Sequence, residues 1–258
     1  MRIAIVVFPG TNCEEETHYV LGTLFGQQVD RIWHQDTDLS AYDCIILPGG
    51  FSYGDHLRAG AIARFSPVMR SVEKLASQDR LILGICNGFQ ILAEAGLLPG
   101  TLLPNAGRSF LSTWVNCRVE SRDTPFTSQI PTGSVLKMPI AHGEGRFFAD
   151  QRILTQLKRH DQIVLRYVDA AGCETDAANP NGSAANIAGI CNEGGNVFGL
   201  MPHPERAAEA ELPSRDGRLI FASMLARTGI RVPIEVGAGT ERYGGVGVGV
   251  ASAHGVPA

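Results

Sequence analysis

A cysteine set between two glycines is the first feature of the sequence that could carry chemistry. Cys86 stands in Gly84-Ile-Cys-Asn-Gly88, directly after an apolar run that begins at Leu81. Apolar residues recur at helical spacing after Gly88, so the segment predicts a buried strand, a tight turn and a helix. This is the pattern of a nucleophile elbow, in which the helix N-terminus favours the thiolate. The alternative is a core cysteine before an ordinary turn.

A histidine and a glutamate stand close together in Met201-Pro-His-Pro-Glu205. The two prolines restrict the backbone and favour an extended segment, in which the side chains of His203 and Glu205 face the same way. A carboxylate bonded to one imidazole nitrogen leaves the other nitrogen free to accept a thiol proton. The segment therefore predicts the base and its orienting group in a Cys–His–Glu triad. The alternative is a surface loop whose His and Glu face water.

The other cysteines and histidines are weaker candidates for chemistry. Cys13 lies near an expected helix start, where three following glutamates oppose a thiolate. Cys44 and Cys191 fall in expected strands. The remaining histidines lack the spacing of metal ligands with cysteines or carboxylates, and we expect no metal site among His34, His56, His142 and His160.

Two adjacent glycines follow another expected strand, in Pro48-Gly-Gly-Phe51. Ligands of open α/β sheets bind at the carboxyl ends of the strands. Glycine lets backbone N–H groups approach a ligand closely, so the N–H groups of Gly50 and Phe51 are candidate donors to an oxyanion. The alternative is a plain turn.

The elements around these segments predict the α/β class. Residues 2–8, 28–34, 44–47 and 81–85 are expected strands of an open, mostly parallel central sheet flanked by helices. Antiparallel strands are expected over 111–119 and 135–140, with a hairpin near 187–201. We expect helices over 13–25, 150–160 and 216–227, and a mostly helical stretch over 57–77 with a break near Pro67. Residues 1–234 are expected to form one domain, followed by a Gly-rich flexible tail over 235–258.

The composition excludes several classes of function. The net charge is −4, and the charges are mixed along the chain, so nothing indicates a nucleic-acid or anionic membrane surface. No apolar run reaches the length of about 20 residues that spans a bilayer. The six cysteines are widely spaced and suit a reducing cytoplasm. The sequence has no Gly-x-x-x-x-Gly-Lys-Ser/Thr motif for nucleotide phosphates.

Taken together, the Pro48-Gly-Gly loop, the Cys86 elbow and the Pro202-His-Pro-Glu205 segment resemble the class I, or triad, glutamine amidotransferases. Longer segments, such as Gly-Gly-Phe-Ser-Tyr-Gly-Asp-His-Leu-Arg-Ala-Gly60 and Met-Pro-Ile-Ala-His-Gly-Glu-Gly-Arg-Phe147, extend the resemblance over roughly residues 1 to 228. The resemblance implies a flavodoxin-like sheet. It also implies that Cys86 attacks the carboxamide of L-glutamine and that His203, oriented by Glu205, transfers the protons.

The resemblance implies further site residues. The N–H groups of Gly50 and Asn87 would form the oxyanion hole. Other residues match positions near the glutamine site of relatives, and Glu144 can equally serve a subunit interface. These residues are Gly49, Phe51, Gln90, His142, Gly143 and Glu144.

The resemblance also implies partners. Because the chain shows no ATP site, ATP-dependent amination with Mg²⁺ would take place on a large synthetase subunit, with a small accessory subunit in the complex. The chain itself would need no cofactor. The glutaminase reaction is expected to be slow in the isolated chain and faster in the complex.

Three alternatives stay open on the sequence. The first is an amidotransferase subunit of a different biosynthetic pathway. The Gly-Asp-His-Leu-Arg and Ala-His-Gly-Glu-Gly segments speak against this alternative. The second is a cysteine peptidase or hydrolase of similar fold, against which the His-Pro-Glu segment speaks. The third is a binding module without activity, which an intact Cys, His and Glu disfavours.

Overall fold

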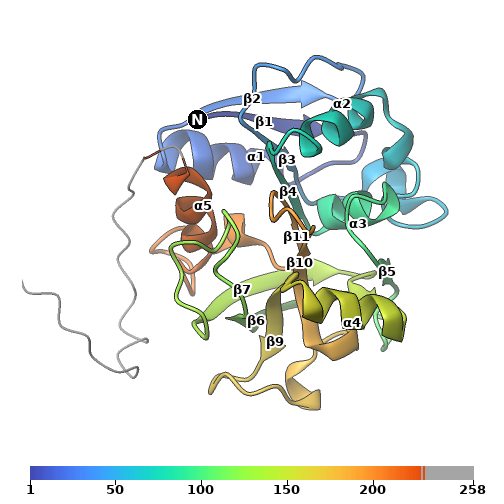
Figure 1. Cartoon of the computed structure of the whole chain (residues 1–258), viewed down its shortest axis with the longest axis vertical. Helices are drawn as coiled ribbons and strands as arrows, with labels where there is room; N and C mark the ends of the chain where they lie inside the picture. Colours follow the sequence, from blue (N-terminus) through green and yellow to red (C-terminus); the bar gives the residue numbers. More distant parts are fainter. Residues whose placement is uncertain (228, 230–258) are drawn as a thin grey trace, which may run out of the picture.

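A computed structural model describes residues 1–227 and 229 and shows a nine-stranded mixed sheet with helices packed against it (Figure 1). The strand order is β2-β1-β3-β4-β11-β10-β9-β6-β7. The predicted domain end at residue 234 and the predicted tail over 235–258 lie outside the described residues.

The first part of the sheet is parallel. Its strands are β1 (Arg2–Val7), β2 (Gln28–Trp33), β3 (Cys44–Leu47), β4 (Leu81–Ile85) and β11 (Val197–Leu200). Strands β3, β4 and β11 are buried along their whole length, as continuous apolar runs in a covered parallel sheet should be. The prediction of an open, mostly parallel α/β sheet is confirmed. The three loops that follow the carboxyl ends of β3, β4 and β11 lie at one edge of this sheet.

The second part of the sheet is antiparallel and continues from β11. It contains β6 (Leu111–Val119), β7 (Val135–His142), β9 (Ile163–Val168) and β10 (Ile187–Cys191). A separate two-stranded sheet pairs β5 (Thr101–Leu103) with β8 (Arg146–Phe148). The strands predicted over 111–119 and 135–140 and the hairpin near 187–201 are thus present. Strands β6, β7, β9 and β10 extend the central sheet, while β11, the second strand of the hairpin, also pairs in parallel with β4.

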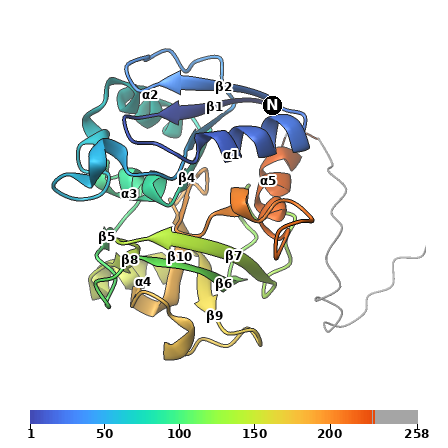
Figure 2. The same ribbon diagram turned by 180° about the vertical axis from the view of Figure 1, so that it is seen from behind.

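Helices cover both faces of the parallel strands. In Figures 1 and 2, α1 and α5 lie on one side and α2 and α3 on the other. Their bounds are α1 (Glu14–His18), α2 (Pro67–Ala76), α3 (Asn87–Glu94), α4 (Gln151–Arg159) and α5 (Gly217–Ala226). A π-helical stretch, Tyr19–Leu24, continues α1. Within the described residues, no helix is long and apolar enough to cross a membrane.

In the mostly helical stretch expected over residues 57–77, the break near Pro67 is confirmed, but the part before it is not α-helical. Helix α2 begins at Pro67, and a short 3-10 helix occupies Ala63–Phe65. Proline at the first helical position favours a helix start there, because its missing N–H would be unpaired in any case. Leu57 and Gly60 have positive φ angles, so the chain before residue 63 cannot be a continuous α-helix.

Candidate active site

Cys86 occupies the sharp turn between β4 and α3, at the carboxyl edge of the parallel strands. Its φ of +50° and ψ of −104° lie in a sparsely populated region for a residue with a side chain. The turn is fixed on both sides, because the Cys86 N–H donates to Leu200 O (2.8 Å) and Cys86 O accepts from the Gln90 N–H (3.1 Å). The thiol, 4% exposed, therefore stands at the start of a helix in a strained and well-supported backbone.

The two glycines of the elbow serve close packing of α3 on the sheet. A Cβ atom on Gly88 would lie 1.8 Å from Leu47 O, and one on Gly84 would lie 2.7 Å from Gly88 O. Both distances are shorter than any real Cβ contact. The glycines of this elbow are thus required by the approach of helix to strand, while the strained φ belongs to Cys86 itself.

Replacement of Gly88 by alanine is expected to destabilise the fold strongly. The new methyl group has no room unless α3 moves away from β3, which costs about 3 kcal/mol or more. Gly96→Ala is the matched control, because Gly96 has a φ of +73° but no heavy atom within 4 Å of the added Cβ. That control should cost only about 1 kcal/mol. Urea unfolding measures both, and equal costs would contradict the packing role of Gly88.

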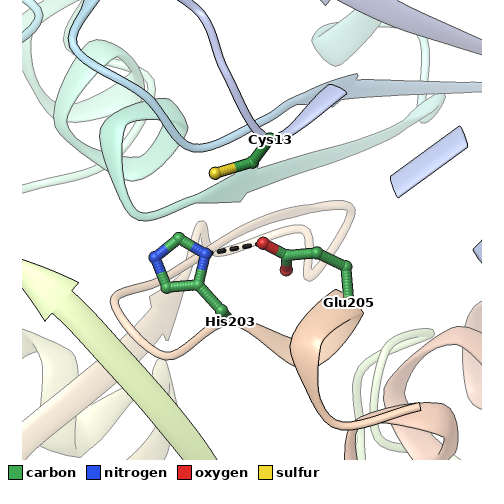
Figure 3. Close-up of side chains that lie close together, drawn as sticks. All are labelled: Cys13, His203 and Glu205. Atoms are coloured by element: carbon green, nitrogen blue, oxygen red, sulfur yellow. Dashed lines mark hydrogen bonds and ion pairs between the residues drawn. The ribbon is translucent and has the colours of Figure 1, made fainter. Parts of the chain in front are cut away.

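His203 and Glu205 form a buried hydrogen-bonded pair just after β11. The distance from His203 Nδ1 to Glu205 Oε1 is 2.6 Å, and the two residues are 2% and 3% exposed (Figure 3). His203 has an extended backbone, and its N–H donates to Pro139 O of β7 (2.8 Å). The prolines on either side of His203 and the bond to β7 fix the direction of the imidazole.

The electrostatics of the pair favour a proton on His203. Burial alone disfavours the imidazolium, but the Glu205 carboxylate and the neighbouring Cys86 outweigh burial and raise the pKa of His203 well above its ordinary value. With Nδ1 bound to Glu205, the tautomer leaves Nε2 as the proton acceptor, and Nε2 is buried without a hydrogen bond. Cys86 Sγ makes one long contact, 3.8 Å, to Ala141 O. The arrangement can accept a thiol proton at His203.

A second cysteine, Cys13, lies beside the His203–Glu205 pair, a position that the sequence pattern does not predict. The donor atoms of Cys13, His203 and Glu205 all lie within 4.8 Å of one another (Figure 3). The segment after β1 reaches this position because the carboxyl ends of parallel strands meet at one edge of the sheet. Burial raises the pKa of the Cys13 thiol, so Cys13 stays protonated more readily than an exposed cysteine.

The Cys13, His203 and Glu205 side chains also have the donor types of a zinc site. Two contacts oppose a cation there. The Arg206 guanidinium donates to Cys13 Sγ at 3.1 Å, and Nδ1 of His203 is already committed to Glu205. We therefore assign no metal to this cluster.

The Gly49–Gly50 turn packs directly against the same cluster. A Cβ on Gly49 would lie 2.7 Å from His203 Cε1 and 3.0 Å from Cys13 Sγ. Gly50 has a φ of +151°, and a Cβ there would lie 2.8 Å from Thr11 Cα. The N–H of Phe51 donates to Gly10 O (2.9 Å), so of the two donors expected from the sequence, Phe51 is already used.

Asn87, a predicted oxyanion donor, and the predicted substrate-contact residues Gln90 and Glu144 form one hydrogen-bonded series beside the elbow. Asn87 Nδ2 donates to Gln90 Oε1 (2.8 Å), and Gln90 Nε2 donates to Glu144 O (2.6 Å). The Ser52 N–H donates to Asn87 Oδ1 (3.1 Å). Gln90 therefore holds the loop after β7 against the first turn of α3.

His142 is buried next to the hydrogen bonds that join Asn87, Gln90 and Glu144, and it stays neutral. Burial lowers its pKa to about 4, and the positive charge of His203 acts in the same direction. His142 Nδ1 bonds to Asn105 Oδ1 (3.0 Å), which fixes the ring. A Cβ on Gly145 would lie 2.1 Å from Cε1 of this ring, so the absence of a side chain at Gly145 makes room for it. His142 is thus a fixed wall of the site, in contrast to the proton-binding His203.

Comparisons with known proteins agree with this geometry. Residues 1–217 match the family model described as CobB/CobQ-like glutamine amidotransferase domain. The chain is 55% identical over 225 residues to the phosphoribosylformylglycinamidine synthase subunit PurQ of Moorella thermoacetica, covering 87% of this chain and 95% of the relative. The PurQ subunit of Thermomicrobium roseum is also 55% identical, over 226 residues that cover 88% of this chain and 96% of the relative.

Solved structures show the same relationship. A chain in the structure of PurLQS from Thermotoga maritima matches with a TM-score of 0.78 and 43% identity, over 88% of this chain and 98% of that chain. A putative GMP synthase subunit from Thermoplasma acidophilum, 18% identical with a TM-score of 0.56 over 88% and 93% of the two chains, shares the fold. The chain therefore belongs to the glutamine amidotransferase family, in the group of the PurQ subunits of phosphoribosylformylglycinamidine synthase.

Proposed function

We propose that this chain is the glutaminase subunit of a phosphoribosylformylglycinamidine synthase. It hydrolyses L-glutamine to glutamate and ammonia, and the ammonia converts formylglycinamide ribonucleotide to formylglycinamidine ribonucleotide in purine biosynthesis. The observation that carries the proposal is the buried His203–Glu205 pair beside the strained Cys86, in a chain whose full-length relatives are such subunits.

The proposed reaction follows from the three side chains. Cys86 Sγ attacks the carboxamide carbon of glutamine while His203 takes the thiol proton. His203 then donates that proton to the departing nitrogen, which leaves as ammonia and produces a glutamyl thioester. Water, deprotonated by His203, attacks the thioester and releases glutamate. Glu205 keeps the imidazole in one orientation throughout.

The tetrahedral intermediates carry a negative oxygen that needs donors. We propose that the N–H groups of Gly50 and Asn87 supply them, because the Phe51 N–H is committed to Gly10. Gln90, Glu144, Gly143, Gly49, Phe51 and His142 would surround the substrate.

The ATP-dependent step belongs, in this proposal, to a partner. A large synthetase subunit would bind ATP and Mg²⁺, together with a small accessory subunit, as the designation PurLQS of the solved relative suggests. This chain would use no cofactor of its own. We propose a cytoplasmic location, because the cysteines of the described residues are all unpaired and five of them are buried.

The test measures glutamine hydrolysis by the isolated chain and by the chain mixed with its synthetase and accessory subunits. We expect slow hydrolysis alone and at least about tenfold faster hydrolysis in the mixture, with the amide nitrogen of ¹⁵N-labelled glutamine recovered in formylglycinamidine ribonucleotide. Full activity of the isolated chain would contradict the proposed dependence on the partner. Failure to restore growth of a purine auxotroph that lacks this subunit would contradict the assigned pathway.

A further inference from the structure

The loop from Phe51 to Gly60, called here the 51–60 loop, is fixed at both ends and exposed at its tip. At its start, the Phe51 N–H bonds to Gly10 O and the Tyr53 N–H bonds to Pro9 O (2.6 Å). At its end, Gly60 lies against α3, where an added Cβ would come within 2.8 Å of Ile91 N. Residues 54 and 56–58 between these anchors are exposed.

The tip of the 51–60 loop holds an unusual run of strained backbone. Tyr53, Asp55 and Leu57 have φ angles of +54°, +54° and +71°, a region that disfavours side chains, and Gly54 between them has a φ of +68°. Leu57 is 93% exposed, the most exposed of the large hydrophobic side chains in the described residues. Leu57 does not pack on the core, and its strained backbone holds it at the tip of the loop, where it can contact another molecule.

The same loop is bonded to the elbow. Asn87, the first residue of α3, receives the Ser52 N–H at Oδ1 (3.1 Å) and donates from Nδ2 to Asp55 Oδ1 through a long bond of 3.4 Å. At the other end of the helix, Arg58 pairs with Glu94 (2.6 Å). The loop that exposes Leu57 is therefore attached along α3, the helix whose first N–H is a proposed oxyanion donor.

Asp55 is held in a place that is costly for a carboxylate. Burial, together with the charge of Glu144, raises the pKa of Asp55 to about 6. The Glu144 side chain in turn accepts from the Ala59 N–H at 3.3 Å. The loop thus lies between the elbow and the 142–145 turn, and a shift of its tip changes the contacts of Asn87 and Glu144 together.

We propose that the 51–60 loop is the docking element for the ammonia-accepting synthetase subunit. Leu57 enters an apolar pocket of that partner, and the hydrogen bond between Asp55 and Asn87 couples the docking to the position of Asn87. Docking would set the Asn87 N–H in its oxyanion-binding position and so raise the glutaminase rate. This inference rests on the proposed function.

Two observations favour the synthetase as the occupant. Ammonia must pass to its acceptor without loss to solvent, so the partner has to meet this chain near the site, and the 51–60 loop is hydrogen-bonded to Asn87 and Glu144 of that site. A pair of exposed aromatic rings adds apolar surface at the start of the loop, and one of them, Phe110, lies beside Gly143 of the 142–145 turn. Phe51 (44% exposed) and Phe110 (54% exposed) face each other with ring centroids 6.4 Å apart. Phe51 follows the Gly49–Gly50 turn, and Phe110 precedes β6, which pairs with His142.

The first test titrates the synthetase and its accessory subunit into this chain and follows glutamine hydrolysis. Leu57→Ser should raise the synthetase concentration for half-maximal stimulation by about 10- to 100-fold, the value of one buried leucine, and leave the stimulated maximum at saturation intact. Tyr19→Ser is the matched control, because Tyr19 is 41% exposed and follows α1, on the other side of the sheet. It should leave both quantities unchanged. An unchanged half-maximal concentration for Leu57→Ser overturns the docking role.

The second test separates binding of the synthetase from the effect of that binding on Asn87 and on the glutaminase rate. Asp55→Ala should keep the half-maximal concentration and lower the stimulated maximum at least about tenfold, because the acceptor that faces Asn87 is lost. Asp55→Asn, which keeps an oxygen at that position, should recover most of the stimulation. If Asp55→Ala is stimulated like the unchanged chain, the coupling through Asn87 is wrong. If the unchanged chain is not stimulated by the synthetase at all, the proposed function fails, and the two failures are thereby distinguished.

Discussion

Replacement of Cys86 by alanine is expected to lower glutamine hydrolysis by at least about a thousandfold. Without the thiol no glutamyl thioester can form, and the remaining groups can only assist direct attack by water. The variant should still fold, because the hydrogen bond from the Cys86 side chain to Ala141 O is long, at 3.8 Å, and alanine keeps the Cβ atom of this turn residue. The complete assembly containing Cys86→Ala should still convert its acceptor when ammonium salts replace glutamine, because the amination site is on another chain.

Cys13→Ala is the decisive control for this experiment. Cys13 is the rival nucleophile, because its Sγ lies within 4.8 Å of the His203 and Glu205 donor atoms. Its buried and protonated character leads us to expect a loss of less than about tenfold. Mass spectrometry after reaction with a glutamine-analogue affinity label should locate the label on Cys86, and label on Cys13 would reverse the assignment. The exposed Cys173 reports nonspecific alkylation.

Glu205→Gln is expected to lower kcat by about a thousandfold to ten-thousandfold while the fold is preserved. The amide can donate to Nδ1, which would place the imidazole proton on Nε2 and remove the acceptor that faces the thiol. Loss of the carboxylate also leaves burial as the main influence on the imidazole, so the pKa of His203 should fall. In the folded protein, the imidazole titration followed by ¹⁵N NMR should therefore shift to lower pH.

The same substitution at Glu209 provides the control for Glu205→Gln. Glu209 accepts a hydrogen bond from the exposed Tyr19 hydroxyl and is not a member of the Cys13–His203–Glu205 cluster. We expect Glu209→Gln to change kcat less than twofold. A similar loss of kcat in both variants would mean that the negative charge of this segment supports activity in general. It would contradict a specific role of Glu205 in orienting His203.

The sequence predicts the parallel sheet and the two halves of the site because both depend on local pattern. Residues 81–85 are apolar at every position except Gly84 and are buried throughout, which is the pattern of a covered parallel strand. The pairing of His203 with Glu205 follows from two prolines that leave the segment few conformations. In each case the deciding interactions lie within a few residues of one another.

The features that the sequence does not reveal depend on contacts between distant segments. Cys13 joins His203 only because strands β1 and β11 end at the same edge of one sheet, a matter of topology. The loop at residues 57–62 has apolar residues at nearly helical spacing, but Gly60 is held against the α3 backbone and a helix would not fit there. The joining of β6, β7, β9 and β10 to the parallel strands likewise rests on long-range pairing.

The position of His203 in the chain has a consequence for protein synthesis. Its N–H bonds to Pro139 of β7, and Gly217 at the start of α5 packs so closely on Pro204 that an added Cβ would lie 2.1 Å from Pro204 O. The base of the site and the Cys86 turn, whose N–H bonds to Leu200 O of β11, are therefore both completed only when the last part of the described chain has been synthesised. A nascent chain that ends before β11 and α5 is thus expected to lack a complete catalytic site, although Cys86 itself is synthesised early.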